Sequence, residues 1–207
     1  MDILTQLMAG SSLAAFAGLR AWLPLLALGL LAREGYAHIN PEFQILTTTP
    51  VLIVLGLLTV LEFLGDKVIA VDHFLDAVGT LLRPISGAVL ASATLTGLDP
   101  TTSLVIGSLL GESTAFTVHT GKAVTRAKAS LFAPLHLGTG NVAFSFTEDI
   151  VSAGGAWLVF HHPVLAFILA LLLVLLALLL IVFAIRTGTK IFRFLTGRHR
   201  APATPAP

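Results

Sequence analysis

The chain has 207 residues, of which 56% are hydrophobic and only 11% are charged, and its formal net charge is +1. Soluble domains contain about 25% charged residues, so this composition excludes an ordinary soluble domain. The apolar residues form long unbroken runs rather than the short alternating segments of a membrane β-barrel. We therefore predict an all-α polytopic membrane protein in contact with the lipid bilayer. Cysteine is absent, which excludes disulfides and thiolate metal sites, and no segment indicates nucleic-acid binding.

Hydropathy and turn signals predict about six transmembrane helices. The N-terminal apolar stretch has no positively charged region before it, so we interpret it as a retained span rather than a signal peptide. Asp99-Pro100 and His161-His162-Pro163 mark two turns, because proline cannot continue a helix. The spans are expected in a single domain over 1–195, followed by a disordered cytoplasmic tail at 196–207. The predicted spans cover 13–31, 50–71, 84–98, 102–125, 142–160 and 164–185.

The lysines and arginines are distributed unevenly between the two sides of this six-span arrangement. Only Arg33 falls on one side, while the other side holds the connections and the C-terminal flank that carry most of the basic residues. Cytoplasmic loops are enriched in lysine and arginine. We therefore predict a multi-pass protein of the cell inner membrane with both termini in the cytoplasm. The residues on the cytoplasmic side are Lys67, Arg83, Lys122, Arg126, Lys128, Arg186, Lys190, Arg193, Arg198 and Arg200.

Two short similarities suggest an internal repeat. The spacing Phe-x-x-Asp occurs at 63–66 and again at 146–149, and Pro84 is expected to open the third span as Pro163 opens the sixth. Two units of three spans would have opposite orientations, which is an arrangement that many transporters use. The pattern therefore favours two inverted three-helix repeats, although such short matches leave an irregular bundle open.

Charged residues form stripes on several of the predicted spans. If 61–84 is treated as one helix, Glu62, Asp66, Asp72, His73 and Asp76 share one stripe, while Lys67 points elsewhere. The fourth span places an acid and several basic groups on one face, and the sixth span has no such residues and is expected to face lipid. The other charged positions are Arg20 in the first span, Glu112, His119, Lys122 and Arg126 in the fourth, and Glu148 and Asp149 in the fifth.

Charges inside a membrane are costly, at about 2.5–3.5 kcal/mol each near a helix centre. Acids and bases nearly balance here, so most of them must pair. One interpretation is a set of structural ion pairs that holds the helices together. The other is a pathway for an ion or substrate, because apolar packing can replace ion pairs at little cost to stability. The candidate pathway residues are Arg20, Glu62, Asp66, Lys67, Asp72, His73, Asp76, Arg83, Glu112, His119, Lys122, Arg126, Glu148 and Asp149.

Four segments resemble a bacterial membrane family catalogued as domain of unknown function 4126. They are GLRAWLPLLALGL, LEFLGDKVIAVDHFLDAVGTLLRPISGAVLA, and HTGKAVTRAKAS with NVAFSFTEDIVSAGGAW, and together they cover about three-quarters of the chain. The resemblance implies no activity. The positions that match the family pattern are Glu62, Phe63, Asp66, Lys67, Asp72, Arg83, Pro84, His119, Lys122, Arg126, Glu148 and Asp149.

A looser similarity concerns cation–proton antiporters with a Glu-x-Gly-Asp-Lys/Arg-Ser/Thr signature. Here Glu62 and Asp66 are separated by one residue more, and Val68 replaces the hydroxyl residue. The extra residue places the two carboxylates one helical turn apart. We treat the similarity as one of chemistry rather than of family.

The leading functional hypothesis is a small secondary transporter or channel for a cation, coupled to protons through these carboxylates. Glu62 and Asp66 at i, i+4 would release a proton and accept a hard cation, with Glu148 and Asp149 completing the site from the facing side. His73 and His119 are candidate proton relays. A metal site at Asp72, His73 and Asp76 is only weakly indicated.

Alternative functions remain open at this point. The basic residues suit a phosphate-bearing anion or lipid headgroup, because arginine binds phosphate through two parallel hydrogen bonds. A non-transporting membrane scaffold is a third hypothesis, and the sequence is compatible with a homo-oligomer. We do not expect an enzyme or a cofactor, because no nucleophile motif or clear metal-ligand motif occurs.

Overall fold

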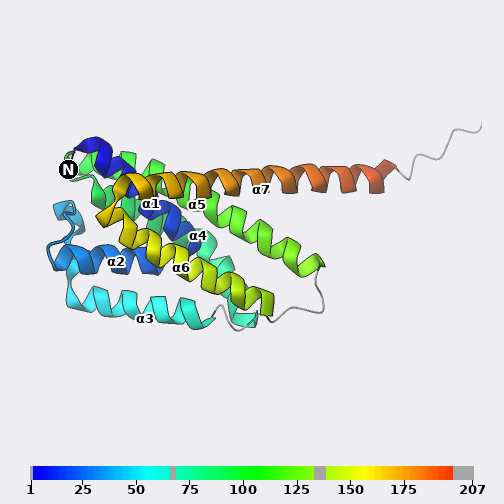
Figure 1. Ribbon diagram of the computed structural model, residues 1–207, viewed down its shortest axis with the longest axis horizontal. Coiled ribbons are helices and arrows are strands. Elements are labelled where there is room, and N and C mark those ends of the chain that lie inside the picture. Colours follow the sequence, from blue (N-terminus) through cyan, green and yellow to red (C-terminus); the bar gives the residue numbers. More distant parts are fainter. Residues whose placement is uncertain (1, 66–68, 133–138, 198–207) are drawn as a thin grey trace, which may run out of the picture.

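Every element in the described part of the chain is a helix, which confirms the predicted all-α class (Figure 1). The computed structural model describes residues 2–65, 69–132 and 139–197, apart from the side chains of 69–73, 127–132, 139–144 and 191–197. The helices are α1 (Ile3–Leu19), α2 (Trp22–Arg33), the 3₁₀-helix η1 (Pro41–Thr47), α3 (Thr49–Gly65), α4 (Ile69–Thr94), α5 (Pro100–Phe132), α6 (Thr139–His161) and α7 (Pro163–Gly197).

The predicted first span at 13–31 is wrong, because this segment forms two short helices that reverse direction. Gln6 near the start of α1 accepts a hydrogen bond from the Gly97 amide in the α4–α5 connection, at 3.0 Å. Asn40, after the end of α2, donates its amide to the Ala93 carbonyl near the end of α4, at 2.8 Å. The start of α1 and the end of α2 therefore lie at the same end of the bundle, and α1 and α2 form a hairpin inside it.

Proline explains where the hairpin turns. Pro24 has no N–H, and its ring clashes with the carbonyl four residues earlier, which belongs to Arg20. A helix cannot run through Arg20 into Pro24, although Pro24 is tolerated in the first turn of a new helix. Arg20 accordingly has an extended backbone, with φ −135° and ψ 114°, and α2 begins at Trp22.

The remaining boundaries agree with the sequence predictions in part. α5, α6 and α7 begin within a few residues of the predicted spans, and Asp99 caps α5 by accepting a hydrogen bond from the Thr102 amide at 3.1 Å. α3 is described as far as Gly65, and residue 71 belongs to α4. α4 begins at Ile69 and contains Pro84 in its interior, so Pro84 does not open a span as Pro163 does. The inverted repeat is not tested by these boundaries and stays a prediction.

α1 lies in the centre of the bundle, and small residues let the neighbouring helices approach closely. Leu13 and Phe16 on α1 are fully buried. α4 and α5 meet backbone to backbone, since a Cβ added at Gly111 would lie 2.1 Å from the Gly87 carbonyl oxygen. Such close packing through small residues is typical of helices in membranes.

Two helical stretches of the described chain are long and apolar enough to cross a membrane. They are Phe74–Thr94 in α4 and Pro163–Lys190 in α7. η1 and α3 meet at 64° and would count as a third span if taken together. These stretches support membrane association, while the predicted count of six spans is not confirmed. α7 presents buried alanines to the bundle and exposed leucines outward, as expected for a lipid-facing helix.

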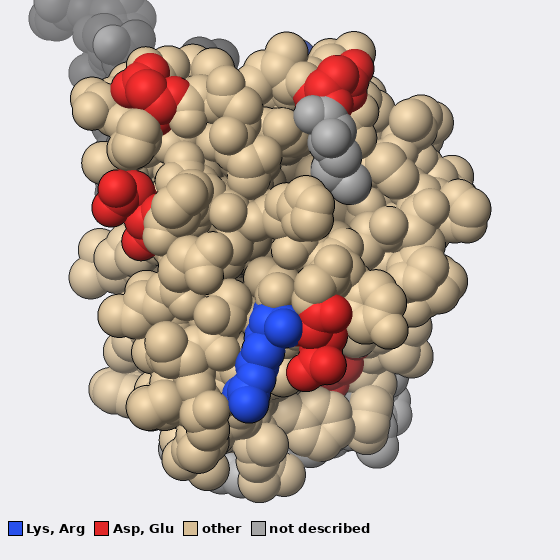
Figure 2. Space-filling view, turned by 90° about the vertical axis from the view of Figure 1, so that its left-hand side faces the viewer, with Lys and Arg blue, Asp and Glu red and all other residues tan. Residues whose placement is uncertain are grey.

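The two ends of the bundle differ in charge. We call one the acidic end, where Asp2, Glu34, Glu42 and Asp99 are exposed together with Arg33, and where more of the surface is acidic than basic (Figure 2). Hydrogen bonds from Thr102 hold the pKa of Asp99 below its usual value, so this end keeps its negative charge. At the opposite end, which we call the basic end, α7 projects from the bundle and carries Arg186 and Lys190.

The prediction that both termini share a side of the membrane is not tested and stays a prediction. That prediction assumed that the first helical segment crosses the bundle from end to end. Because α1 and α2 return to the acidic end, the described chain begins at the acidic end, and α7 ends beyond the basic end (Figure 1).

Candidate functional site

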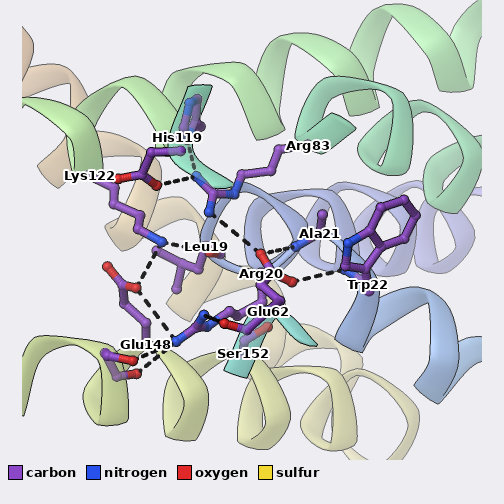
Figure 3. Close-up of polar contacts among 12 residues, drawn as sticks. Leu19, Arg20, Ala21, Trp22, Glu62, Arg83, His119, Lys122, Glu148 and Ser152 are labelled. Atoms are coloured by element: carbon purple, nitrogen blue, oxygen red, sulfur yellow. Dashed lines mark hydrogen bonds and ion pairs between the residues drawn. The ribbon is translucent and has the colours of Figure 1, made fainter. Parts of the chain in front are cut away.

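The break between α1 and α2 exposes backbone groups that a continuous helix would satisfy internally. We call the segment from Leu19 to Trp22 the helix break. The Leu19 carbonyl accepts a hydrogen bond from Lys122 Nζ at 3.1 Å. The amides of Ala21 and Trp22 donate to Glu62 Oε1 at 3.2 Å and to Oε2 at 3.4 Å (Figure 3). Helix C-termini carry partial negative charge and N-termini carry partial positive charge, so each charged side chain meets the helix end of opposite sign.

Four acidic and four basic side chains surround the helix break and form a connected ion-pair network. Arg83 joins Glu62 to Asp76, at 3.5 Å and 3.2 Å. Arg126 then joins Asp76 to Glu148, at 3.1 Å and 3.0 Å. Members of this network come from α3, α4, α5 and α6 as well as from the break itself. They are Arg20, Glu62, Asp76, Arg83, Lys122, Arg126, Glu148 and Asp149.

Arg20 links the helix break to α3 and α6. Its Nε atom lies 2.7 Å from Asp149 Oδ1, and its Nη2 atom lies 4.0 Å from Glu148 Oε2. The guanidinium also donates to the Glu62 carbonyl at 3.4 Å and to the Ser145 carbonyl at 3.2 Å. The Ser145 hydroxyl accepts a further bond at 2.9 Å. A planar guanidinium with five N–H groups suits this position between two helices.

His119 lies beside Arg83 on the inner side of α5. Arg83 Nη1 contacts His119 Nδ1, and because a guanidinium only donates, Nδ1 must accept. The hydrogen of the neutral ring is then on Nε2, which lies 3.1 Å from the Thr80 hydroxyl. Thr80 in turn donates to the Asp76 carbonyl at 3.1 Å. His119 is therefore placed as a neutral hydrogen-bonding bridge, and the proposed proton relay stays a prediction.

The network is deeply buried. The side chains of Arg83, Arg20 and Lys122 are 1%, 2% and 3% exposed. Unpaired charges in such surroundings would cost several kcal/mol each, which explains why acids and bases occur in equal number among the described residues of the network. Asp76 is the most exposed member, at 23%.

Two cavities lie on either side of the Glu148–Asp149 pair. One has a volume of about 190 Å³ and is lined by Lys122, Arg126 and Glu148 on one side and by α7 leucines on the other. The second, of about 240 Å³, is lined by Arg20, Glu62 and Asp149, together with apolar residues of α2, α3 and α6. Adjacent residues of α6 thus face two different spaces, with the ion-pair network between them.

Most of the predicted pathway residues meet at this site. Glu112 does not, because it lies on an exposed face of α5. Asp66 and Lys67, and the side chains of Asp72 and His73, lie outside the described residues, so the proposed Glu62–Asp66 pair and the Asp72-His73-Asp76 metal site cannot be placed. In the described part of the chain, no group of three or more metal-ligating side chains occurs. The members brought together are Arg20, Glu62, Asp76, Arg83, His119, Lys122, Arg126, Glu148 and Asp149.

The single stripe predicted for 61–84 is wrong, because Arg83 Nη2 lies 3.5 Å from Glu62 Oε1, whereas one straight helix would place residues 62 and 83 about 30 Å apart. Glu62 and Asp76 therefore come from two helices and meet through Arg83. Sequence reasoning also missed the backbone groups of the helix break, as well as Thr80. Pro24 was the signal that would have located the break.

The fold and the site define an all-helical membrane-type protein with a charged network built around a broken helix. The chain belongs to the family described as Domain of unknown function (DUF4126), whose model matches residues 7–182. This match confirms the resemblance found in the sequence. No curated protein and no solved structure shows a significant match to the chain.

Proposed function

We propose that the protein is a secondary transporter that exchanges a small cation for protons at the helix break. The observation that carries this proposal is the position of the Lys122 ammonium. It lies 3.1 Å from the Leu19 carbonyl oxygen and 2.8 Å from Glu148 Oε2. A carbonyl at the end of an interrupted helix together with a carboxylate is the ligand set that transporters use for sodium ions. The ammonium thus occupies a position suited to a free cation.

Lysine differs from the other bases of the network in one respect that matters for exchange. Arginine stays protonated in proteins, whereas the lysine ammonium can lose a proton and become neutral. A cation that enters between Leu19 and Glu148 would take the place of the Lys122 charge. The released proton would leave through solvent, and the neutral amine would move aside. The charge balance of the network is the same before and after this exchange.

One observation favours a second candidate, the transport of an anion such as a phosphate-bearing solute or lipid headgroup. The cavity beside α7 is lined by two bases, Lys122 and Arg126, and by one acid, Glu148. Both bases already contact Glu148 Oε2, at 2.8 Å and 3.0 Å. An entering anion would have to compete with that carboxylate, which makes this candidate the weaker of the two.

The experiment that tests the proposal uses purified protein in liposomes that contain a pH-sensitive dye. An inward gradient of sodium or potassium ions should drive protons outward, and a pH gradient should drive uptake of radioactive sodium or rubidium. Liposomes without protein provide the background. Uptake of radioactive phosphate without cation movement would transfer support to the anion candidate, and absence of all flux would favour a scaffold.

We propose that the basic end faces the cytoplasm and that the acidic end faces away from it, in the cell inner membrane. The uneven distribution of lysine and arginine between the two ends supports this orientation, because cytoplasmic segments are enriched in these residues. A reporter enzyme that is active only outside the cytoplasm should be active when inserted in the loop between Arg33 and Pro41, and also when fused before Asp2. The same reporter should be inactive when fused after Gly197. Activity at Gly197 but not at the loop would reverse the orientation.

A further inference from the structure

Glu112 stands apart from the ion-pair network on an otherwise apolar surface. Its neighbours on α5 include Leu109, which is 69% exposed, and Phe116, which is 48% exposed. The preceding residue, Gly111, packs against Gly87, which lies inside the candidate span Phe74–Thr94. The Glu112 carboxyl therefore lies at the depth of a membrane span and on a face of α5 suited to lipid.

Glu112 differs from the acids of the network because it has no counter-charge among the described side chains. Across residues 2–65, 69–132 and 139–197, wherever side chains are described, it makes no hydrogen bond or ion pair. An uncompensated carboxylate at this depth costs about 2.5–3.5 kcal/mol. Ionisable groups in such positions usually serve a function, and their partner must come from another molecule when the chain supplies none.

A groove beside Glu112 has the shape and chemistry of a binding site. Its volume is about 180 Å³, and it lies between η1, α4 and α5. The walls are mainly apolar and include Phe43, Val89 and Leu104. The polar lining consists of Glu112 and the hydroxyls of Ser92 and Ser108. Ligand sites in proteins typically combine apolar walls with a few polar groups that fix orientation.

We propose that this groove binds an organic cation with an apolar body, which enters from the lipid phase. The positive group would pair with Glu112, and the apolar body would pack between Val89 and Leu104. The Phe43 ring lines the same groove and would add an apolar contact. A bare metal ion fits poorly, because calcium requires six to eight oxygen ligands and magnesium requires octahedral coordination. The site is separate from the helix break and does not depend on the proposed exchange function.

Equilibrium dialysis with radiolabelled benzyltrimethylammonium, an organic cation small enough for the groove, tests this proposal. The full chain is held in lipid nanodiscs, and empty nanodiscs give the background that is subtracted. We expect saturable binding of one cation per chain. Glu112→Gln keeps the shape of the groove and removes its charge, so it should weaken binding about tenfold or more. Ser108→Leu keeps the charge and fills the groove, so it should weaken binding to a similar extent. Glu42→Gln at the acidic end is the matched control and should bind like the parent.

Three results would overturn the proposal. The first is the absence of saturable binding by the folded parent protein. The second is binding that remains unchanged in both Glu112→Gln and Ser108→Leu. The third is a parent protein that sediments as a dimer and becomes monomeric in Glu112→Gln, because a second copy of the chain would then cover the groove.

Discussion

Replacing Arg83 with methionine is expected to lower the free energy of unfolding by about 3–5 kcal/mol. Arg83 is 1% exposed and pairs with Glu62 at 3.5 Å and with Asp76 at 3.2 Å. The substitution fills a similar volume, and among the described residues it leaves the buried Glu62 carboxylate with the Ala21 and Trp22 amides as partners. Breaking a buried ion pair costs more than the pair itself contributes, because the remaining charge has lost its compensation. Chemical or thermal unfolding in detergent micelles measures the loss.

A double substitution separates this electrostatic cost from lost packing. Arg83→Met combined with Glu62→Gln removes both charges, so it should recover part of the stability lost in Arg83→Met alone. Arg33→Met is the matched control at the acidic end, where Arg33 is exposed and bonds only the Thr49 hydroxyl at 3.1 Å. It should change stability by less than about 1 kcal/mol. Equal losses in Arg83→Met and Arg33→Met would show that the network does not hold the fold together.

Parts of the site that depend on helical spacing could be predicted from the sequence. His119, Lys122 and Arg126 lie three to four residues apart on α5, so any helix through this segment presents them on one face. Glu148 was placed on the inner face of its helix for the same reason. Charge balance also predicted that these groups pair, since a membrane interior does not tolerate unpaired charges.

The features that escaped prediction depend on contacts between distant parts of the chain. Hydropathy treats 13–31 as one apolar span. Pro24 can interrupt this span because Glu62 and Lys122 satisfy the backbone groups that the break exposes. Lys122 and Leu19 are separated by 103 residues in sequence, and no local pattern indicates that they meet. Likewise, the stripe predicted for 61–84 assumed one continuous helix, whereas Glu62 and Asp76 meet from two helices, α3 and α4.

Replacing Lys122 with arginine is expected to abolish cation–proton exchange while the protein stays folded. Arginine retains the positive charge that balances Glu148, but it cannot release a proton near neutral pH. The guanidinium would then permanently occupy the cation-binding position between Leu19 and Glu148. Lys122→Met should have the opposite effect, because it removes the ammonium and leaves the Leu19 carbonyl and the Glu148 carboxylate free to bind a cation. This variant should bind a cation without releasing a proton.

The pH dependence of cation binding distinguishes these variants most directly. In the parent, protons on Lys122 compete with the cation, so a one-for-one exchange should weaken cation affinity about tenfold for each unit that the pH falls. Lys122→Met should lose this dependence, and Lys122→Arg should bind too weakly to measure. Calorimetry in buffers with different ionisation enthalpies gives both the affinity and the number of protons released. Lys190→Arg, on the projecting part of α7, is the matched control and should behave like the parent. Proton release by Lys122→Arg equal to that of the parent would assign the exchangeable proton to another group and overturn the role proposed for Lys122.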